Sequence, residues 1–395
     1  MYHARIDYDA ICDVAVERHA GVSGQIDHLA DRLPATHGFL RAAWFGSSDC
    51  ADAATLVASR IDGTPFAALP TIGIGPSLVG ARIVPGSYWP FRSMPLAPDA
   101  THAELKAFLE HPVTLQSLGP IWRLGPIYAD DPATRALKQA AASAGWTVLV
   151  RRLGHTFLFD TGGGWPRSST RRRLANYARQ LDQQGSVRYQ LVRGTDWNDA
   201  VLDDLATVEQ ASWVGRATDG TGAKFMSAER REDWRRVLAD PALADALTAT
   251  ILRVDERPVA FSFDLIAAPM QYGIASSYDD DFAAFRPGKL VTAHQIGIAR
   301  DLGVERIDFG AGDSGYKREM GAALGPEILD LLIVRHRSAA SLLKMKWGSE
   351  SEIAREAYRA ANAVRDAGRE SAGRRRFEAW ITIGALAAAA ISFAE

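Results

Sequence analysis

Two stretches of the chain share the same succession of hydrophobic and polar positions. Each begins with two short runs of alternating hydrophobicity around a polar turn, which is typical of a β-hairpin. The shared residues are Arg60-Ile61-Asp62 with Pro65-Phe66-Ala67 and, in the second stretch, Arg253-Val254-Asp255 with Pro258-Val259-Ala260. A strand, a helix, a glycine and a further strand follow each hairpin. The agreement predicts an internal repeat.

The elements after both hairpins are predicted from alternation, helix-start residues and terminal glycines. In the first copy they are a strand at 121–128, a helix from 132 to 144 and a strand at 146–152; in the second they are a strand at 271–279, a helix at about 290–302 and a strand at 305–310. We therefore predict two related α+β units, joined near residues 153–166.

This pattern divides the 395 residues into three expected parts: an N-terminal unit at 1–155, a second unit at 156–335 and a helical tail at 336–395. The tail ends in an uncharged, alanine-rich run at 379–394, preceded by arginines at 374–376. The run is shorter than the ~20 residues that span a bilayer. We expect a helix docked on the protein or on a partner, and a membrane contact stays open as the alternative.

The composition is that of a folded soluble protein, with 47% hydrophobic and 23% charged residues. Lys plus Arg is 45 and Asp plus Glu is 47, a formal net charge of −2, so a nucleic acid or lipid partner would need a local basic patch. One such patch is a predicted helix from Arg171 to about Gln184, where five arginines between 167 and 179 face only Asp182. Phosphate binding and an ordinary solvated helix face both explain it.

Other classes of function find little support. The two cysteines form no disulfide framework or zinc motif, the nine histidines have no ligand spacing, and the first 21 residues do not form a signal peptide. We therefore expect a cytoplasmic protein without a metal. The string from Gly310 to Gly315 matches G-x-G-x-x-G, but Pro326 follows too soon for the long helix of a dinucleotide site.

A second anion site is predicted just upstream, where Arg286-Pro287-Gly288-Lys289 precedes a helix. Backbone N–H groups at a helix start and the helix dipole together favour phosphate. The absence of a side chain at Gly288 lets a ligand approach the backbone closely. The next strand is followed by Tyr316-Lys317, which places a tyrosine beyond that strand.

These motifs together resemble one branch of the GNAT superfamily of acyl-CoA transferases, the CelD/BcsL-type or BioF2-like acetyltransferases. The resemblance covers about residues 155–322. It rests on the basic helix and on the segments Glu209 to Arg216, Ser276 to Asp279, Arg286 to Leu290, Gly303, Ile307 to Gly310, Gly312-Asp313 and Tyr316-Lys317. The branch is commonly a tandem of two GNAT-like folds with a mixed sheet flanked by helices, and Fem-type aminoacyltransferases are its relatives.

The resemblance implies roles for individual residues. In the family, the strand before the helix hydrogen-bonds the pantetheine arm of acyl-CoA, and the helix start holds the pyrophosphate. The corresponding donor-binding residues here are Ser276, Ser277, Arg286, Gly288, Lys289 and Leu290. Tyr316 is placed to protonate the departing thiolate, and Glu209, Asp264 and Asp313 are the candidate bases for the acceptor amine. The implied acceptor-binding residues are Trp213, Arg216, Tyr278 and Lys317.

The sequence departs from the family pattern in two places. One is the segment expected to bind the acceptor, and the other is the donor-site motif in the first copy. Val214 stands where the branch usually has lysine, and 217–220 loosen the usual continuation, so acceptor recognition is expected to differ. The first copy has Asp131-Pro132-Ala133 in place of Arg286-Pro287-Gly288 and no Tyr-Lys pair after its last strand. It therefore resembles a degenerate scaffold that has lost the donor site.

Three functions stay open at this point. The first is a cytoplasmic N-acyltransferase that uses acetyl-CoA or another acyl-CoA as co-substrate, with a peripheral position at the inner membrane as the open alternative. Its acceptor would be an amine of a sugar, an amino acid or a polysaccharide precursor. The second is a Fem-like transferase that takes its donor from charged tRNA, whose phosphates the arginines at 167–179 would contact. The third is a non-catalytic tandem scaffold in polysaccharide biosynthesis.

Overall fold

The computed structural model describes residues 13–46, 52–75, 79–85, 90, 94–218, 220, 222–312 and 316–347. Within this part of the chain the strands form one twelve-stranded mixed sheet in the order β1-β2-β3-β4-β5-β12-β6-β11-β10-β9-β8-β7. The strands are β1 Ala15–Ala20, β2 Ala54–Ser59, β3 Pro65–Gly73, β4 Arg82–Ile83, β5 Ile121–Tyr128, β6 Thr147–Asp160, β7 Val187–Arg193, β8 Leu247–Val254, β9 Arg257–Ala267, β10 Met270–Tyr278, β11 Arg306–Ala311 and β12 Ala323–Val334.

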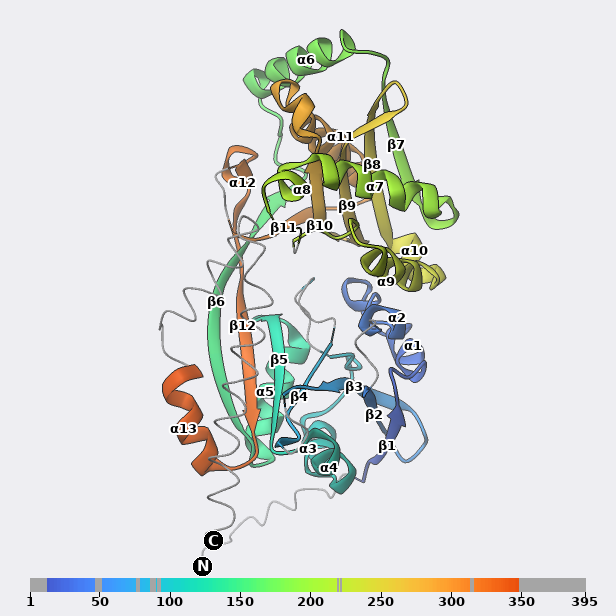
Figure 1. Ribbon diagram of the computed structural model, residues 1–395. Coiled ribbons are helices and arrows are strands. Elements are labelled where there is room, and N and C mark those ends of the chain that lie inside the picture. The colour runs from blue at the N-terminus through green and yellow to red at the C-terminus, as the bar shows by residue number, and fades with distance from the viewer. Residues whose placement is uncertain are drawn as a thin grey trace, which may run out of the picture.

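Helices cover both parts of this sheet, as expected of the predicted α+β fold class (Figure 1). Those of the first half are α1 Gln25–Ala30, η1 Ala35–His37, α2 Ala42–Phe45, α3 His102–Glu110, α4 Pro112–Leu118 and α5 Pro132–Ser143. Those of the second half are α6 Ser168–Asp182, η3 Gly194–Asp196, α7 Asp199–Ala211, α8 Trp213–Ala217, α9 Ala228–Leu238, α10 Pro241–Ala246, η4 Asp280–Phe285, α11 Pro287–Asp301 and α12 Tyr316–Glu319, and α13 Arg337–Trp347 follows.

The internal repeat is present in the order of the elements. β2, β3, β5, α5 and β6 follow one another in the first half as β8, β9, β10, α11 and β11 do in the second. The predicted helices begin and end within a few residues of the observed ones, because capping residues and turn glycines mark those ends locally.

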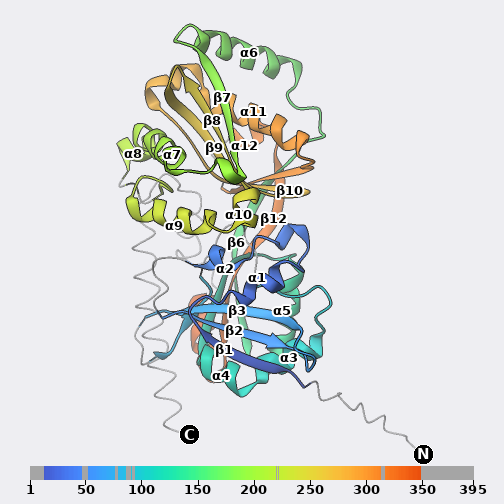
Figure 2. The same cartoon turned by 90° about the vertical axis from the view of Figure 1, so that its right-hand side faces the viewer.

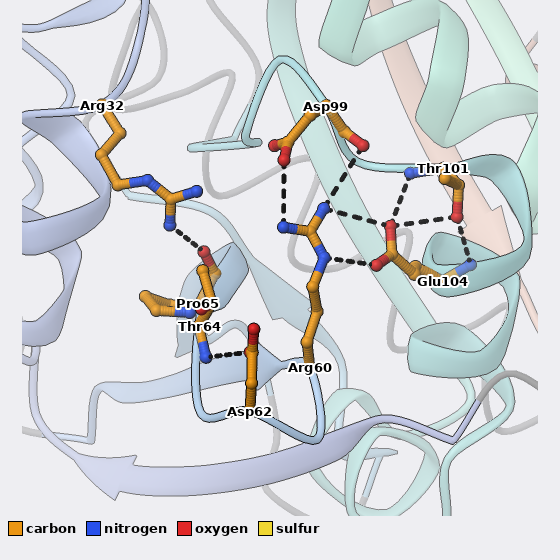
Figure 3. A network of polar contacts seen from close by, with 8 residues as sticks. All are labelled: Arg32, Arg60, Asp62, Thr64, Pro65, Asp99, Thr101 and Glu104. Carbon is orange, nitrogen blue, oxygen red and sulfur yellow. Dashed lines mark hydrogen bonds and ion pairs between the residues drawn. The ribbon is translucent and has the colours of Figure 1, made fainter.

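The arginine of the repeated Arg-x-Asp motif has the same structural role in both hairpins. Arg60 donates from Nε to Oε1 of Glu104 on α3 at 2.6 Å, and Thr101 and Glu104 form a capping box (Figure 3). Asp62 accepts the N–H of Thr64 in the turn at 2.9 Å. In the second copy Arg253 pairs with Asp204 on α7. Each arginine therefore ties its hairpin to a helix of its own half.

Two long strands connect the halves. β6 and β12 pair with each other antiparallel over most of their length and run side by side from the first half into the second (Figures 1 and 2). The first part of the expected joint at 153–166 is therefore the continuation of β6, and residue 155 lies inside that strand. Asp330 of β12 is fully buried and accepts hydrogen bonds from Arg123 and Arg151. Cζ of Arg151 lies 4.2 Å from the centroid of the Trp347 ring on α13.

The two halves also pack directly on each other. Trp44 of α2 meets Trp234 of α9 with ring centroids 6.4 Å apart, and Phe39 lies 6.4 Å from Tyr272 of β10. Arg41 donates from Nε to Oδ2 of Asp240 at 2.7 Å. Because burial of large aromatic side chains contributes strongly to stability, these contacts fix the first half against the second.

No helix among the described residues is long and apolar enough to cross a membrane. The apolar run at 379–394, for which a docked helix was predicted, lies outside the part of the chain that the structure describes.

Candidate active site

The second copy contains a separation between two neighbouring parallel strands. β10 and β11 pair only at Met270↔Arg306, Gln271↔Ile307 and Tyr272↔Asp308. Beyond these positions β10 stays on β9 through an irregularity at Gly273/Ala275, while β11 continues along β6. The facing edges of β10 and β11 are then no longer paired with each other, so their backbone groups can receive an extended ligand.

The first copy has no such separation. Its corresponding strands are β5 and β6, and β12 lies between them, paired antiparallel with both. A strand from the other half therefore occupies the position that a ligand could take in the second copy.

Helix α11 begins beside the separated strands. Its N-cap residue Arg286 adopts the left-handed conformation at φ 55° and ψ 45°, and no side chain caps the helix. Lys289 and Leu290 donate to the carbonyl oxygen of Arg286 at 3.0 and 3.3 Å, and Pro287 has no N–H. The Gly288 N–H is thus left without a partner inside the helix. A Cβ at Gly288 would lie 3.1 Å from Cδ1 of Tyr278, so a larger residue would displace that ring.

The predicted donor-binding residues other than Ser277 lie near this place. Ser276 is exposed and pairs with Ser262 of β9, whereas Ser277 is buried opposite Phe261. Since neighbouring strand residues alternate between faces, Ser276 and Tyr278 face α11 and Ser277 faces the opposite side. Leu290 is buried in a cluster with Tyr278, which anchors the first turn of α11.

Helix α12 lies against the end of β11 and the start of α11. Tyr316 is 36% exposed, and its ring centroid lies 6.4 Å from that of Phe309. Lys317 is buried, and its Nζ donates to the carbonyl oxygens of Gly310 and Ala311 at 2.9 and 2.8 Å. Lys317 Nζ also lies over the ring of Phe157, 5.6 Å from its centroid. Asp313, the third predicted catalytic residue, lies outside the described residues.

A buried carboxylate that joins the halves was not assigned to the site by the sequence. Asp308 of β11 accepts hydrogen bonds from Tyr128 Oη at 2.7 Å, Thr156 Oγ1 at 2.8 Å and the Gly310 N–H at 2.8 Å. Burial raises the pKa of Asp308 to about 6 against the opposing effect of these bonds. Tyr128 comes from β5 of the first half, 180 residues away in sequence, so no local pattern could have indicated this contact.

Two further candidate bases have different surroundings. Glu209 at the end of α7 is buried and accepts the N–H groups of Lys224 and Phe225 at 2.8 and 2.7 Å, so it holds the segment before α9. Burial raises its pKa, and the backbone N–H donors oppose that shift. Asp264 is fully enclosed opposite Gly273, accepts from Ser262 Oγ at 2.7 Å, and burial raises its pKa to about 7.

The predicted acceptor residues Trp213 and Arg216 lie on α8, which packs against α7. Trp213 is half-buried. Arg216 donates to Asp281 at 2.8 Å, and Arg257 donates to the other oxygen of Asp281 at 2.9 Å. Both guanidinium groups lower the pKa of Asp281 to about 2. Arg216 therefore ties the acceptor-side helix to the turn that leads into α11.

Comparison with known proteins defines the class of this region. Residues 168–318 match the family model described as an acetyltransferase (GNAT) domain. The match contains the separated strands, the start of α11 and α12, so this part of the chain has the GNAT-type acyltransferase fold. No curated protein matches the sequence.

Solved structures have a similar fold over most of the chain. FemX matches with a TM-score of 0.53 at 10% identity, covering 83% of this chain and 100% of that one. L-PGS from Bacillus licheniformis matches with a TM-score of 0.51 at 13% identity, covering 86% and 98%. The C-terminal domain of a putative lysylphosphatidylglycerol synthetase from Agrobacterium fabrum matches with a TM-score of 0.51 at 13% identity, covering 81% of this chain and 94% of that one. At these identities the likeness concerns the fold.

Proposed function

We propose that the protein is an N-acyltransferase that moves an acetyl or longer acyl group from acyl-CoA to an amine acceptor. One observation carries the proposal: inside the matched acetyltransferase domain, β10 and β11 separate beside the uncapped start of α11. The separated edges suit an extended pantetheine arm, and the Gly288 N–H suits a pyrophosphate, while Arg286 and Lys289 add positive charge for the phosphates of the donor. Sugar amines, amino acids and polysaccharide precursors are the acceptor classes we propose.

The reaction is a direct transfer. The neutral amine attacks the thioester carbonyl, so a C–N bond forms and the C–S bond breaks. The departing thiolate takes a proton, for which Tyr316 is the proposed donor. Before the attack the ammonium gives one proton to a base, because an amine with a pKa near that of lysine, ~10.4, is mostly protonated at neutral pH. After the C–N bond has formed the nitrogen loses a second proton, which balances the proton that Tyr316 gives to the thiolate.

Glu209 is the candidate base whose carboxylate already holds backbone N–H groups. Both of its oxygens accept such groups, and these hydrogen bonds oppose the uptake of a proton from the substrate. Glu209→Gln separates the proposed role as a base from the structural role as a hydrogen-bond acceptor. The amide oxygen should keep part of the contacts to the backbone N–H groups, but the side chain can no longer take up a proton. The described residues contain no group of three His, Cys, Asp or Glu arranged to hold a metal, and the proposed reaction uses none.

Calorimetric titration with acetyl-CoA and CoA tests the donor. We expect wild type to bind in the micromolar range and Gly288→Trp to lose that binding, because the indole would fill the start of α11. Gly297→Trp is the matched control in the same helix, where a Cβ meets nothing within 4 Å. The proposal is wrong if wild type binds neither ligand or if both variants bind alike.

A specific observation favours a second candidate, a transferase that uses aminoacyl-tRNA. None of the five arginines at 167–179 forms an ion pair within the described residues, so a helix-long basic surface is available for phosphates. RNA binding whose affinity falls steeply with salt, together with no binding of CoA, would favour this donor.

A further inference from the structure

The arginines of α6 differ from those of α9 in their partners. On α9, Arg231, Arg235 and Arg236 each pair with a carboxylate. Within the described part of the chain, no carboxylate pairs with the α6 set, which is Arg167, Arg171, Arg172, Arg173 and Arg179. Unpaired arginines of one sign on one helix produce a positive field that an anionic ligand can neutralise.

Helix α6 is also held firmly in place. Leu181 is fully buried, and Leu174, Tyr177 and Ala178 pack in the same cluster as Leu290 and Val291 of α11. Figure 1 shows α6 beside α11. Arg300 of α11 donates to the carbonyl oxygens of Thr161 and Trp165, both at 2.7 Å, and so fixes the segment before α6. The apolar side of α6 is therefore occupied, and its arginines are carried on a fixed support beside the start of α11.

Arg173 lies near the first turn of α11, because the next residue, Leu174, packs in the same cluster as Leu290. Lys289 donates from Nζ to Oε2 of Glu319 on α12 at 3.0 Å. The pKa of Glu319 is lowered first by Lys289 and further by the charges of Arg173 on α6 and Arg286 at the start of α11. Lys289 thus contacts Glu319 directly, the charges of Arg173 and Arg286 act on the same carboxylate, and both partners of the Lys289–Glu319 pair are substantially exposed. Exposed pairs of this kind contribute little to stability and exchange readily.

We propose that Arg173, Arg286 and Lys289 form a subsite for the phosphate monoester of the donor nucleotide, which Glu319 occupies as an internal carboxylate in the absence of donor. The proposal rests on the proposed acyl-CoA function and adds a residue of α6 to its site. A phosphate monoester carries about −1.5 to −2 charges at pH 7 and three acceptor oxygens, so it competes well with a single carboxylate. Two arginines can hold such a group with paired, charge-assisted hydrogen bonds.

The test compares CoA with 3′-dephospho-CoA, which lacks only the phosphate monoester, by calorimetry at fixed salt. We expect wild type to bind CoA more tightly than dephospho-CoA. Arg173→Ala should weaken CoA about tenfold and leave dephospho-CoA unchanged, since a charged hydrogen bond is lost. Glu319→Gln should strengthen CoA severalfold because the competing charge is removed. The two variants therefore change one affinity in opposite directions, which a general loss of folding does not produce.

Arg179→Ala is the matched control, because Arg179 is an unpaired arginine of the same helix, six residues further along. It should leave the preference for CoA unchanged. The subsite is wrong, while the acyl-CoA function stands, if wild type binds both nucleotides equally, if Arg173→Ala weakens both equally, or if Arg179→Ala has the same effect as Arg173→Ala. If wild type binds neither nucleotide, the proposed function itself fails.

Discussion

The two copies of the repeat contain the same succession of elements but differ at the start of one helix. In the first copy, buried Asp131 caps α5: its Oδ2 accepts the N–H of Thr134 at 3.2 Å, and its Oδ1 lies 2.6 Å from Nε2 of His37. In the second copy, Arg286 precedes α11 and provides no side-chain cap. The first copy supplies its own carboxylate to the positive end of the helix dipole, whereas the second leaves that end for a ligand.

The strands of the first copy are likewise closed to a ligand, and those of the second copy are open. β12 lies between β5 and β6 in the first copy, whereas β10 and β11 are neighbours that separate after three paired positions. An intact repeat therefore does not imply two sites, because a strand from elsewhere in the chain can fill one of them.

Among the differences between the two copies, the buried acid Asp264 gives the largest expected effect, a change in how the free energy of unfolding depends on pH. The repeat aligns Asp264 of β9 with Thr71 of β3, so only the second copy buries a titratable group there. The pKa of Asp264 is about 7 in the folded protein, against ~3.9 in an unfolded chain. The folded protein thus retains a proton that the unfolded chain releases, and the resulting stability is lost as pH rises from about 4 to about 7.

Asp264→Asn removes this titration. We expect the difference in free energy of unfolding between the two proteins to shift by up to about 4 kcal/mol in favour of the variant across that range. Urea unfolding between pH 4.5 and pH 8 measures it. A difference that does not vary with pH would show that Asp264 keeps an ordinary pKa.

Tyr316 has no counterpart in the first copy, which makes it the next most informative position. Tyr316→Phe removes the proposed proton donor, so we expect kcat to fall about 100-fold, as general acid catalysis typically contributes at least that much. The KM for the donor should stay close to wild type. Steady-state kinetics with acetyl-CoA and an accepted amine would give both values, and an unchanged kcat would remove Tyr316 from the mechanism.

The smallest expected effect concerns the capped helix. Asp131→Ala should destabilise the protein by about 1 kcal/mol, since a helix loses its N-cap. It should not create a second donor site, because β12 still fills the space between β5 and β6. Urea unfolding and calorimetry with CoA check the two parts. A second equivalent of bound CoA would mean that the cap, and not β12, closes the first copy.

The sequence by itself determined the local structure. Alternation, helix caps and turn glycines predicted the repeated hairpins, the strand at 121–128, helix α5 and the succession from β10 to β11. The motif around Gly288 predicted the open helix start, and charge predicted the basic helix. Each of these follows from interactions between residues close in sequence, which a pattern can record.

Only the tertiary structure decided which copy stays open and what its polar residues contact. β12 enters between β5 and β6 from about 190 residues further along the chain, Tyr128 reaches Asp308, and Glu209 holds the backbone of Lys224. The unpaired state of the α6 arginines likewise depends on which carboxylates the fold brings near. Packing of distant segments sets these contacts, and neither periodicity nor spacing encodes them.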